Sequence, residues 1–249
     1  MKSIFPIIAL MVFAVSAKAQ KQIQITWLGH AAFEIVSPGG TTILIDPFLK
    51  QNPATPAARK DLTAYKPNAI LITHSHFDHA ADVVEIARSS KAVVIGEFEY
   101  VSDLAIPDDQ KKGGNVGGKF AVGDVTVHMM PAMHSSIPSG RPVGFVIRFG
   151  DGRTLYHSGD TWIFGDMALI QELYKPSIIL LTVGGGPFTQ DPQTAGLAVR
   201  KYFTPDVIIP MHYGTWPPLA QEADVRKAFE GMKNVVILKP GEQRAYENQ

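Results

Sequence analysis

The sequence contains no cysteine among its 249 residues. This absence excludes disulfide bonds, thiolate metal sites, cysteine nucleophiles and a lipid anchor on an N-terminal cysteine. Any metal site in the chain must therefore use nitrogen and oxygen ligands.

An excess of charge of one sign is also missing, because 23 Lys and Arg residues balance 23 Asp and Glu residues. A neutral chain has no electrostatic reason to bind nucleic acid or an anionic membrane, so we expect neither as a partner. Hydrophobic residues form 45% of the chain, which is enough for a folded core. Since there is no repeat and no dividing linker, we predict a single domain over residues 20–249.

No apolar run is long enough to span a bilayer, which takes about 20 residues. The segment Ile4–Val15, apolar apart from Pro6, is well short of this length. It follows a short basic start, and Ala17-Lys18-Ala19 then supplies the small residues of a cleavage site. We predict a signal peptide at residues 1–19 and a soluble, exported protein that is periplasmic in a cell with two membranes. An N-terminal membrane anchor is the alternative.

Strand patterns occur along the whole of the remaining chain. Gln22–Leu28 alternates polar and apolar residues, and Phe33–Val36 and Thr41–Asp46 flank a Pro-Gly-Gly turn typical of a hairpin. Three segments that begin with proline are apolar on both faces, which indicates central strands covered on both sides. These three are Pro67–Thr73, Pro176–Thr182 and Pro205–Pro210. Further strands are predicted at Ala92–Ile95, Val125–Met130, Val143–Phe149, Thr154–Tyr156 and Val235–Leu238.

Helical patterns lie between the predicted strands. The predicted helices are Ala80–Arg88 with Asp78 as its cap, a helix from the cap Asp191 to about Phe203, and Leu219–Glu230. The polar, glycine-rich segment Asp109–Gly118 is expected to be an exposed loop. This mixture predicts an α/β (α+β) fold in which helices cover sheets.

Three histidines and an aspartate lie within six residues, in His74-Ser75-His76-Phe77-Asp78-His79. In an extended segment His74 and His76 point to the same side, because strand side chains repeat every two residues. Where the chain turns into a helix, Asp78 and His79 would approach the same centre from another direction. Imidazole and carboxylate groups are ligands for divalent metals, so this cluster predicts a metal site.

Three more candidate ligands follow strands or lie in turns. They are His134 in Pro131–Ser135, Asp160 in His157–Thr161, and His212 in Pro210–Thr215. A sheet scaffold builds a site from loops at the ends of separate strands, which is where these residues fall. Each would be an ordinary loop residue alone, and its value comes from the set.

This set of motifs resembles the metallo-β-lactamase fold, a four-layer αβ/βα sandwich with one or two metal ions between facing sheets. More narrowly, Trp27–Phe33, Leu44–Phe48 and Ile209–Thr215 resemble a poorly characterised group of metal-dependent hydrolases. That group lies near the ascorbate-6-phosphate lactonases and, more distantly, phospholipase-D-like members of the fold. The resemblance runs from about Gln22 to Gly241.

The resemblance implies a complete set of metal ligands. They are His74, His76 and His134 for one ion, Asp78, His79 and His212 for a second, and Asp160 as the bridge between them. Asp46 matches a buried aspartate that supports the site by orienting a ligand. The implied cofactor is a pair of divalent metal ions, zinc in the first place, with manganese or iron as alternatives.

The function implied by the resemblance is that of a hydrolase. A metal-bound hydroxide would attack a small ester, lactone, amide or phosphodiester. Asp78 would orient the hydroxide or relay a proton, and Asp160 would hold both ions. His30 would contact the substrate, support a ligand or be purely structural. A metal-containing redox or binding protein on the same fold is the alternative, and the number of subunits is open.

Two histidines and one loop carry weaker predictions. His157 either supports a ligand or is an ordinary strand residue, and His128 is most simply a strand residue. The loop Val183–Thr189 is one residue longer than in the resembled group and contains Pro187. This difference changes the wall of the expected pocket, so the choice of small-molecule substrate is open.

Overall fold

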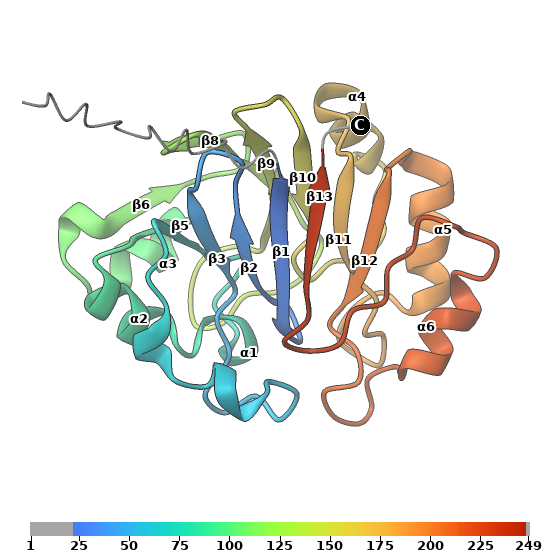
Figure 1. Cartoon of the computed structure of the whole chain (residues 1–249), viewed down its shortest axis with the longest axis horizontal. Helices are drawn as coiled ribbons and strands as arrows, with labels where there is room; N and C mark the ends of the chain where they lie inside the picture. Colours follow the sequence, from blue (N-terminus) through green and yellow to red (C-terminus); the bar gives the residue numbers. More distant parts are fainter. Residues whose placement is uncertain (1–21, 248–249) are drawn as a thin grey trace, which may run out of the picture.

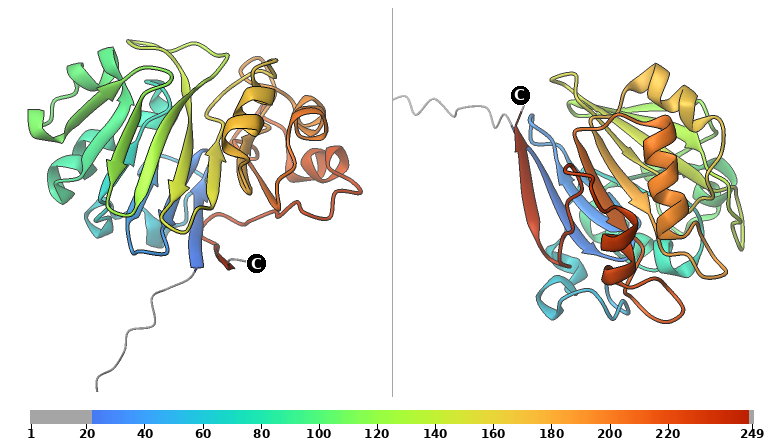
Figure 2. Two further views of the ribbon diagram at one scale, coloured as in Figure 1. Left: turned by 90° about the horizontal axis from the view of Figure 1, so that it is seen from above. Right: turned by 90° about the vertical axis from the view of Figure 1, so that its right-hand side faces the viewer.

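The computed structural model describes residues 22–247, so the predicted signal peptide at residues 1–19 lies outside the described residues. Two β-sheets face each other, and helices cover the outer side of each sheet (Figures 1 and 2). The predicted four-layer αβ/βα arrangement is confirmed. No helix between residues 22 and 247 combines the length and the apolar character needed to cross a bilayer.

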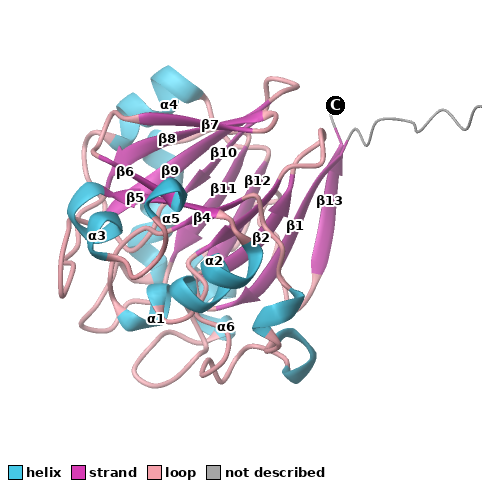
Figure 3. Cartoon of the chain, turned by 90° about the vertical axis from the view of Figure 1, so that its left-hand side faces the viewer, coloured by secondary structure: helices cyan, strands magenta, loops and turns pink. Residues whose placement is uncertain are grey.

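The first sheet contains seven strands within the described residues. In spatial order they are β13 (Gln243–Glu247), β1 (Gln22–Gly29), β2 (Ala32–Val36), β3 (Thr42–Ile45), β4 (Ala69–Leu71), β5 (Val93–Glu97) and β6 (Lys111–Gly114). Neighbours from β13 to β3 are antiparallel, and those from β3 to β6 are parallel. The helices on this side are α1 (Phe77–Ala80), α2 (Val83–Ser90) and α3 (Phe98–Asp103), shown in Figure 3.

The second sheet contains six strands within the same range. In spatial order they are β12 (Val207–Met211), β11 (Ile178–Thr182), β10 (Thr154–His157), β9 (Val143–Phe149), β8 (Val125–Pro131) and β7 (Lys119–Val122). β12, β11 and β10 are parallel, and the others are antiparallel. The helices on this side are α4 (Met167–Tyr174), α5 (Pro192–Tyr202) and α6 (Glu222–Ala228) (Figure 2).

The core follows from the two-residue repeat of the strands. In β3, Ile43 and Ile45 belong to the cluster between the two sheets, and Leu44 belongs to the cluster under α2. Phe145 and Ile147 of β9 contribute to the first cluster from the opposite sheet. Because both faces of the inner strands are buried, the loops at the strand ends have a rigid support.

The prediction of one continuous helix at Ala80–Arg88 is wrong, because the helix is interrupted between α1 and α2. At this interruption, the carboxylate of Asp82 accepts hydrogen bonds from the backbone N–H groups of Leu49 (2.6 Å) and Lys50 (2.9 Å). Asp78 does not cap the helix either, since α1 begins after His76 and Asp78 lies in its first turn. The carboxylate of Asp78 is thereby left to face the site.

Three further predictions need correction at the edges of the sheets. β12 is an edge strand rather than a central one, although most of it is buried. The segment Val235–Leu238, which was predicted to be a strand, forms only one isolated bridge to β12, between Val235 and Ile208. Asp109–Gly118 is not simply a loop, because it contains the edge strand β6. Polar and glycine residues are tolerated there, since an edge strand pairs on one side only.

The helix cap at Asp191 is confirmed. Its Oδ1 accepts a hydrogen bond from the backbone N–H of Thr194 at 2.7 Å, and Pro192 occupies the first turn of α5. This cap fixes the start of a helix that packs on the outer face of the second sheet.

The carboxylate of Asp124 joins the two sheets at one end of the sandwich. It lies in the turn between β7 and β8 and accepts hydrogen bonds from Ser37, Thr41 and the N–H of Gly39 in the turn between β2 and β3. Burial raises the pKa of Asp124, but these hydrogen bonds outweigh burial and lower the pKa below its usual value. The ionised carboxylate is therefore the form that the fold stabilises.

We expect Asp124→Ala to destabilise the fold by about 1–2 kcal/mol at pH 7, because a partly exposed charged acceptor loses its donors. Since the pKa is lowered in the folded state, this contribution is present above the unfolded pKa and is lost as the pH falls. Urea unfolding at pH 7 and at pH 3 measures the difference, which should shrink at pH 3. An equal difference at both pH values would contradict this role for the charge.

Candidate metal centre

The loops at one end of the sandwich, the end where α1 lies, contribute all of the predicted ligands (Figure 1). Each of these loops follows the carboxyl end of a strand. His30 follows β1, Asp46 follows β3, the residues from His74 to His79 follow β4, His134 follows β8, Asp160 follows β10, and His212 directly follows β12. Residues separated by almost 200 positions in the sequence therefore meet at one place.

Three imidazoles form the first group. The Nδ1 atom of His76 lies 2.9 Å from Nε2 of His74 and 3.3 Å from Nε2 of His134. One N–H can join only one such pair, so the remaining nitrogen lone pairs face one another across a short distance. Lone pairs that converge in this way suit a shared cation.

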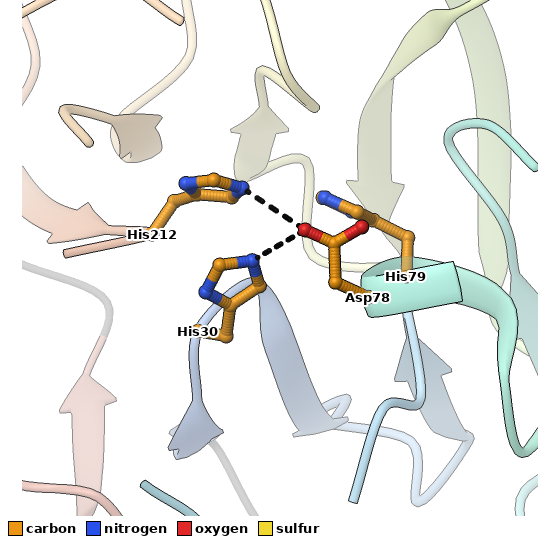
Figure 4. Close-up of side chains that lie close together, drawn as sticks. All are labelled: His30, Asp78, His79 and His212. Atoms are coloured by element: carbon orange, nitrogen blue, oxygen red, sulfur yellow. Dashed lines mark hydrogen bonds and ion pairs between the residues drawn. The ribbon is translucent and has the colours of Figure 1, made fainter. Parts of the chain in front are cut away.

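Asp78, His79, His212 and His30 form the second group, in which one ligand atom of each lies within 4.8 Å of the others (Figure 4). Oδ2 of Asp78 lies 3.8 Å from Nε2 of His212 and 3.1 Å from Nε2 of His30. The carboxylate thus points into a ring of imidazoles.

Asp160 lies between the two groups. Its Oδ2 atom is 3.0 Å from Nε2 of His212 and 3.4 Å from Nε2 of His79, both in the second group. The same atom is 3.8 Å from Nε2 of His134 in the first group. A single carboxylate therefore reaches both halves of the centre, and Asp160 itself is buried.

The donor atoms fit a divalent metal. Nε2 of His79 and both ring nitrogens of His212 are buried and form no hydrogen bond in the described part of the protein. Buried polar atoms normally have a partner, because an unsatisfied one costs about 1–3 kcal/mol. Imidazole and carboxylate ligands without thiolates suit zinc, manganese or iron. A cation would satisfy these atoms together.

The charges of the site favour the same conclusion. Burial raises the pKa of Asp160, but His212 and His79 beside it outweigh burial and lower the pKa well below its usual range. Burial likewise raises the pKa of Asp78, but the hydrogen bond from His30 and the neighbouring imidazoles lower it overall. Burial and the nearby His212 lower the pKa of His30 to about 3, so its imidazole is neutral. The buried carboxylate of Asp160 and the half-buried one of Asp78 thus stay ionised, which favours a bound cation.

Asp46 and Thr73 hold a ligand in each half of the centre. Oδ2 of Asp46 lies 2.8 Å from Nδ1 of His79, and because a carboxylate only accepts, that nitrogen carries the proton. The hydroxyl of Thr73 donates to the same oxygen at 2.6 Å, so its own oxygen accepts from Nδ1 of His74 at 3.0 Å. Both histidines therefore present Nε2 to the centre.

His30 is fully buried beneath the site and does not line its cavity. Its Nε2–H donates to Asp78, and its Nδ1 accepts from the hydroxyl of Thr215 at 2.9 Å. Trp216 stacks on its ring, with centroids 4.9 Å apart. This environment favours a supporting role for His30 over contact with a substrate.

Backbone strain is concentrated at the centre. Among the described residues, five non-glycine residues have positive φ, and three of them are His30 (57°), Asp46 (45°) and His212 (65°). A left-handed conformation is uncommon for residues other than glycine, although Asp and His adopt it more readily than most, and such residues cluster at functional sites. Each of the three turns a side chain toward the ligand cluster directly after its strand.

Neither of the other two histidines belongs to the groups of possible metal ligands found among the described residues. His157 is buried in β10, where its Nε2–H donates to the carbonyl of Ala31 (3.2 Å) and its Nδ1 accepts from the N–H of Gly159 (3.1 Å). It shapes the turn that precedes Asp160 without reaching the ligand cluster. His128 lies in β8 against the ring of Tyr174, so its interpretation as a strand residue agrees with the structure.

A cavity of about 560 Å³ opens over the ligands. Its lining residues are His76, Phe77, Asp78, His134, Ser135, Asp160, Pro187, Phe188, His212, Trp216 and Leu219. The volume falls in the range of cavities that hold small molecules. The size and the ligand cluster together indicate an active site.

Comparison with known proteins supports this interpretation. A family model described as a beta-lactamase superfamily domain matches residues 24–212. A UPF0173 metal-dependent hydrolase of Myxococcus xanthus is 42% identical over 242 residues, which cover 92% of this chain and 85% of the relative. The chain belongs to the UPF0173 family of metal-dependent hydrolases, within the metallo-β-lactamase superfamily.

Two further comparisons cover nearly the whole of the proteins they match. The UPF0173 metal-dependent hydrolase of Pyrobaculum arsenaticum is 42% identical over 226 residues, covering 88% of this hydrolase and 98% of the relative. The structure of Igni18, a novel metallo hydrolase from Ignicoccus hospitalis, has a TM-score of 0.80 at 34% identity and covers 92% of this chain and 100% of that one. The predicted metal-dependent hydrolase is thereby confirmed as a family assignment.

Proposed function

We propose that the protein is an exported hydrolase that cleaves a small ester, lactone, amide or phosphodiester with two divalent metal ions. The observation that carries the proposal is the position of Asp160, one of whose oxygens lies within 4 Å of imidazoles in both ligand groups. The group that the sequence resembles lies near the ascorbate-6-phosphate lactonases, which supports the lactone class among these substrates. The signal peptide predicted at residues 1–19 supports export.

His74, His76 and His134 would hold one ion, Asp78, His79 and His212 the other, and Asp160 both. Such a pair of ions, when bound, would supply a water of lowered pKa and polarise the scissile group. Asp78 lies beside the cavity and would accept a proton from the attacking water. His30 keeps one oxygen of this carboxylate oriented through its 3.1 Å hydrogen bond.

The test combines a metal assay with a substrate panel. The purified protein is stripped with a chelator, reloaded with zinc, manganese or iron, and assayed on lactones, β-lactams and phosphodiesters. We expect two metal ions per chain and hydrolysis that depends on them. Full activity of folded, metal-free protein would overturn the proposal. Stoichiometric iron with visible absorption and no hydrolysis would favour the redox alternative.

A further inference from the structure

The cavity has two unlike walls. The polar wall consists of Ser135 and five of the predicted ligands, and the apolar wall consists of Phe77, Pro187, Phe188, Trp216 and Leu219. Phe77 and Phe188 are 66% and 52% exposed, respectively, although they are aromatic. Exposed apolar side chains that gather at the mouth of a cavity mark a surface for a ligand.

Trp216 fixes the apolar wall close to the ligand cluster. It stacks on His30 and packs edge-on against Phe48, with ring centroids 6.1 Å apart. The ring of Phe77 lies nearly parallel to that of Trp216, at 18° and a centroid distance of 6.3 Å. Since His30 in turn contacts Asp78, the apolar wall begins beside the reacting centre rather than at a distance from it.

The described lining of the cavity lacks the basic side chains that commonly hold a phosphate group. Among the described residues that line the cavity there is neither Lys nor Arg, and the charged ones are Asp78 and Asp160. Phosphate groups are typically held by Arg forks or Lys ammonium groups. A substrate with a phosphate remote from the scissile bond would find no partner on the apolar wall.

We infer that the substrate is an unphosphorylated ester, lactone or amide with an apolar or aromatic substituent that lies against Phe77, Phe188 and Trp216. This inference rests on the proposed hydrolytic function. In the reaction, the oxygen of water bonds to the acyl carbon and the bond to the leaving oxygen or nitrogen breaks. The proton from water passes to the leaving group.

The test uses γ-lactones that share one ring and differ in the length of an alkyl tail. Full burial of each added methylene raises kcat/KM by up to about fourfold until the wall is covered. Phe188→Ala should flatten this dependence on tail length, and Phe188→Leu should retain most of it. Leu173→Ala is the matched control, because Leu173 is 64% exposed on α4 and does not line this cavity.

Binding is measured separately from turnover. Cyclic ketones with the same tails lack the scissile bond, and their dissociation constants should fall with tail length by calorimetry in both metal-free and metal-loaded protein. A lactone whose tail ends in a phosphate monoester should be cleaved more slowly than the uncharged lactone of equal length.

The outcomes separate this inference from the proposed function. Hydrolysis that is independent of tail length, or that favours the phosphorylated lactone, overturns the inference of an apolar substituent but not the proposed hydrolytic function. The same holds if Phe188→Ala and Leu173→Ala behave alike. Cleavage of phosphodiesters alone overturns the inference but not the proposed function. Failure of the metal-loaded protein to cleave any lactone, ester, amide or phosphodiester overturns both.

Discussion

Asp160→Ala should abolish both metal binding and hydrolysis while the fold persists. Replacement of a residue that only orients a ligand typically costs 10- to 100-fold, so loss of a shared ligand should exceed about 100-fold in activity. The fold should persist because the partners of Asp160 are the imidazoles of the centre, apart from a long contact of 3.5 Å with Thr182. Elemental analysis and thermal unfolding measure the two properties on one sample.

The stability of the wild type and of the Asp160→Ala variant must be compared with and without excess chelator, because bound metal stabilises only the wild type. With metal at 100 times its dissociation constant, the wild type gains about 2.7 kcal/mol that the variant cannot gain, so their unfolding temperatures should differ. In excess chelator the two should unfold at similar temperatures. Asp108→Ala, at a position whose side chain is 97% exposed, is the control and should change none of these properties.

His76→Ala should give the same loss of metal and activity, because His76 lies between the other two imidazoles of its group. Full activity of either folded variant without bound metal would exclude a metal-dependent reaction at this centre.

The convergence of four of the seven candidate ligands could be predicted from short local patterns in the sequence. His74 and His76 alternate along an extended segment, and Asp78 and His79 follow where a helix begins, so their convergence needs only strand and helix geometry. His134, Asp160 and His212 could be named as candidates because they follow strands or lie in turns. Their grouping at one centre needed the resemblance, because no local rule brings loops from different strands together. The structure places all seven side chains around one centre.

The supporting residues could not be predicted in the same way. Thr73 and Thr215 carry no signal that separates them from ordinary threonines, and their roles depend on partners 27 to 185 positions away. Trp216 gave no signal, because a tryptophan after a turn reads equally well as core. Long-range partners of this kind are fixed by tertiary packing, not by local propensity.

The edge strand β6 was missed for a related reason. The patterns that predict strands depend on apolar faces, and β6 has the sequence Lys-Lys-Gly-Gly. Its pairing with β5 comes from backbone hydrogen bonds in a sheet that already exists. The inner strands next to the site, by contrast, were apolar enough to be predicted. The position of the site could therefore be predicted from the sequence, whereas the edges of the sheets could not.

Asp46→Asn should weaken metal binding about 10- to 100-fold although Asp46 is not a predicted ligand. Oδ2 accepts from both His79 and Thr73, and Oδ1 accepts from the N–H of Thr73 at 2.8 Å. Both oxygens of Asp46 accept hydrogen bonds, so in either orientation of the asparagine amide its NH₂ group would face another donor instead of an acceptor. Asn tolerates the left-handed backbone at this position, so the backbone is not the cause of the loss.

The conflict between donors in the Asp46→Asn variant is relieved if His79 moves its proton to Nε2, the atom that faces the centre. Nitrogen NMR of the imidazole should therefore show the opposite tautomer for His79, together with a loss of about 1–3 kcal/mol in stability. Thr73→Val should affect His74 instead, and Thr73→Ser should restore the wild-type behaviour. Asp82→Asn is the matched control, because Asp82 is a buried aspartate that accepts two backbone N–H groups outside the site. If it weakens metal binding as much as Asp46→Asn does, the effect is one of general stability and the orienting role of Asp46 is wrong.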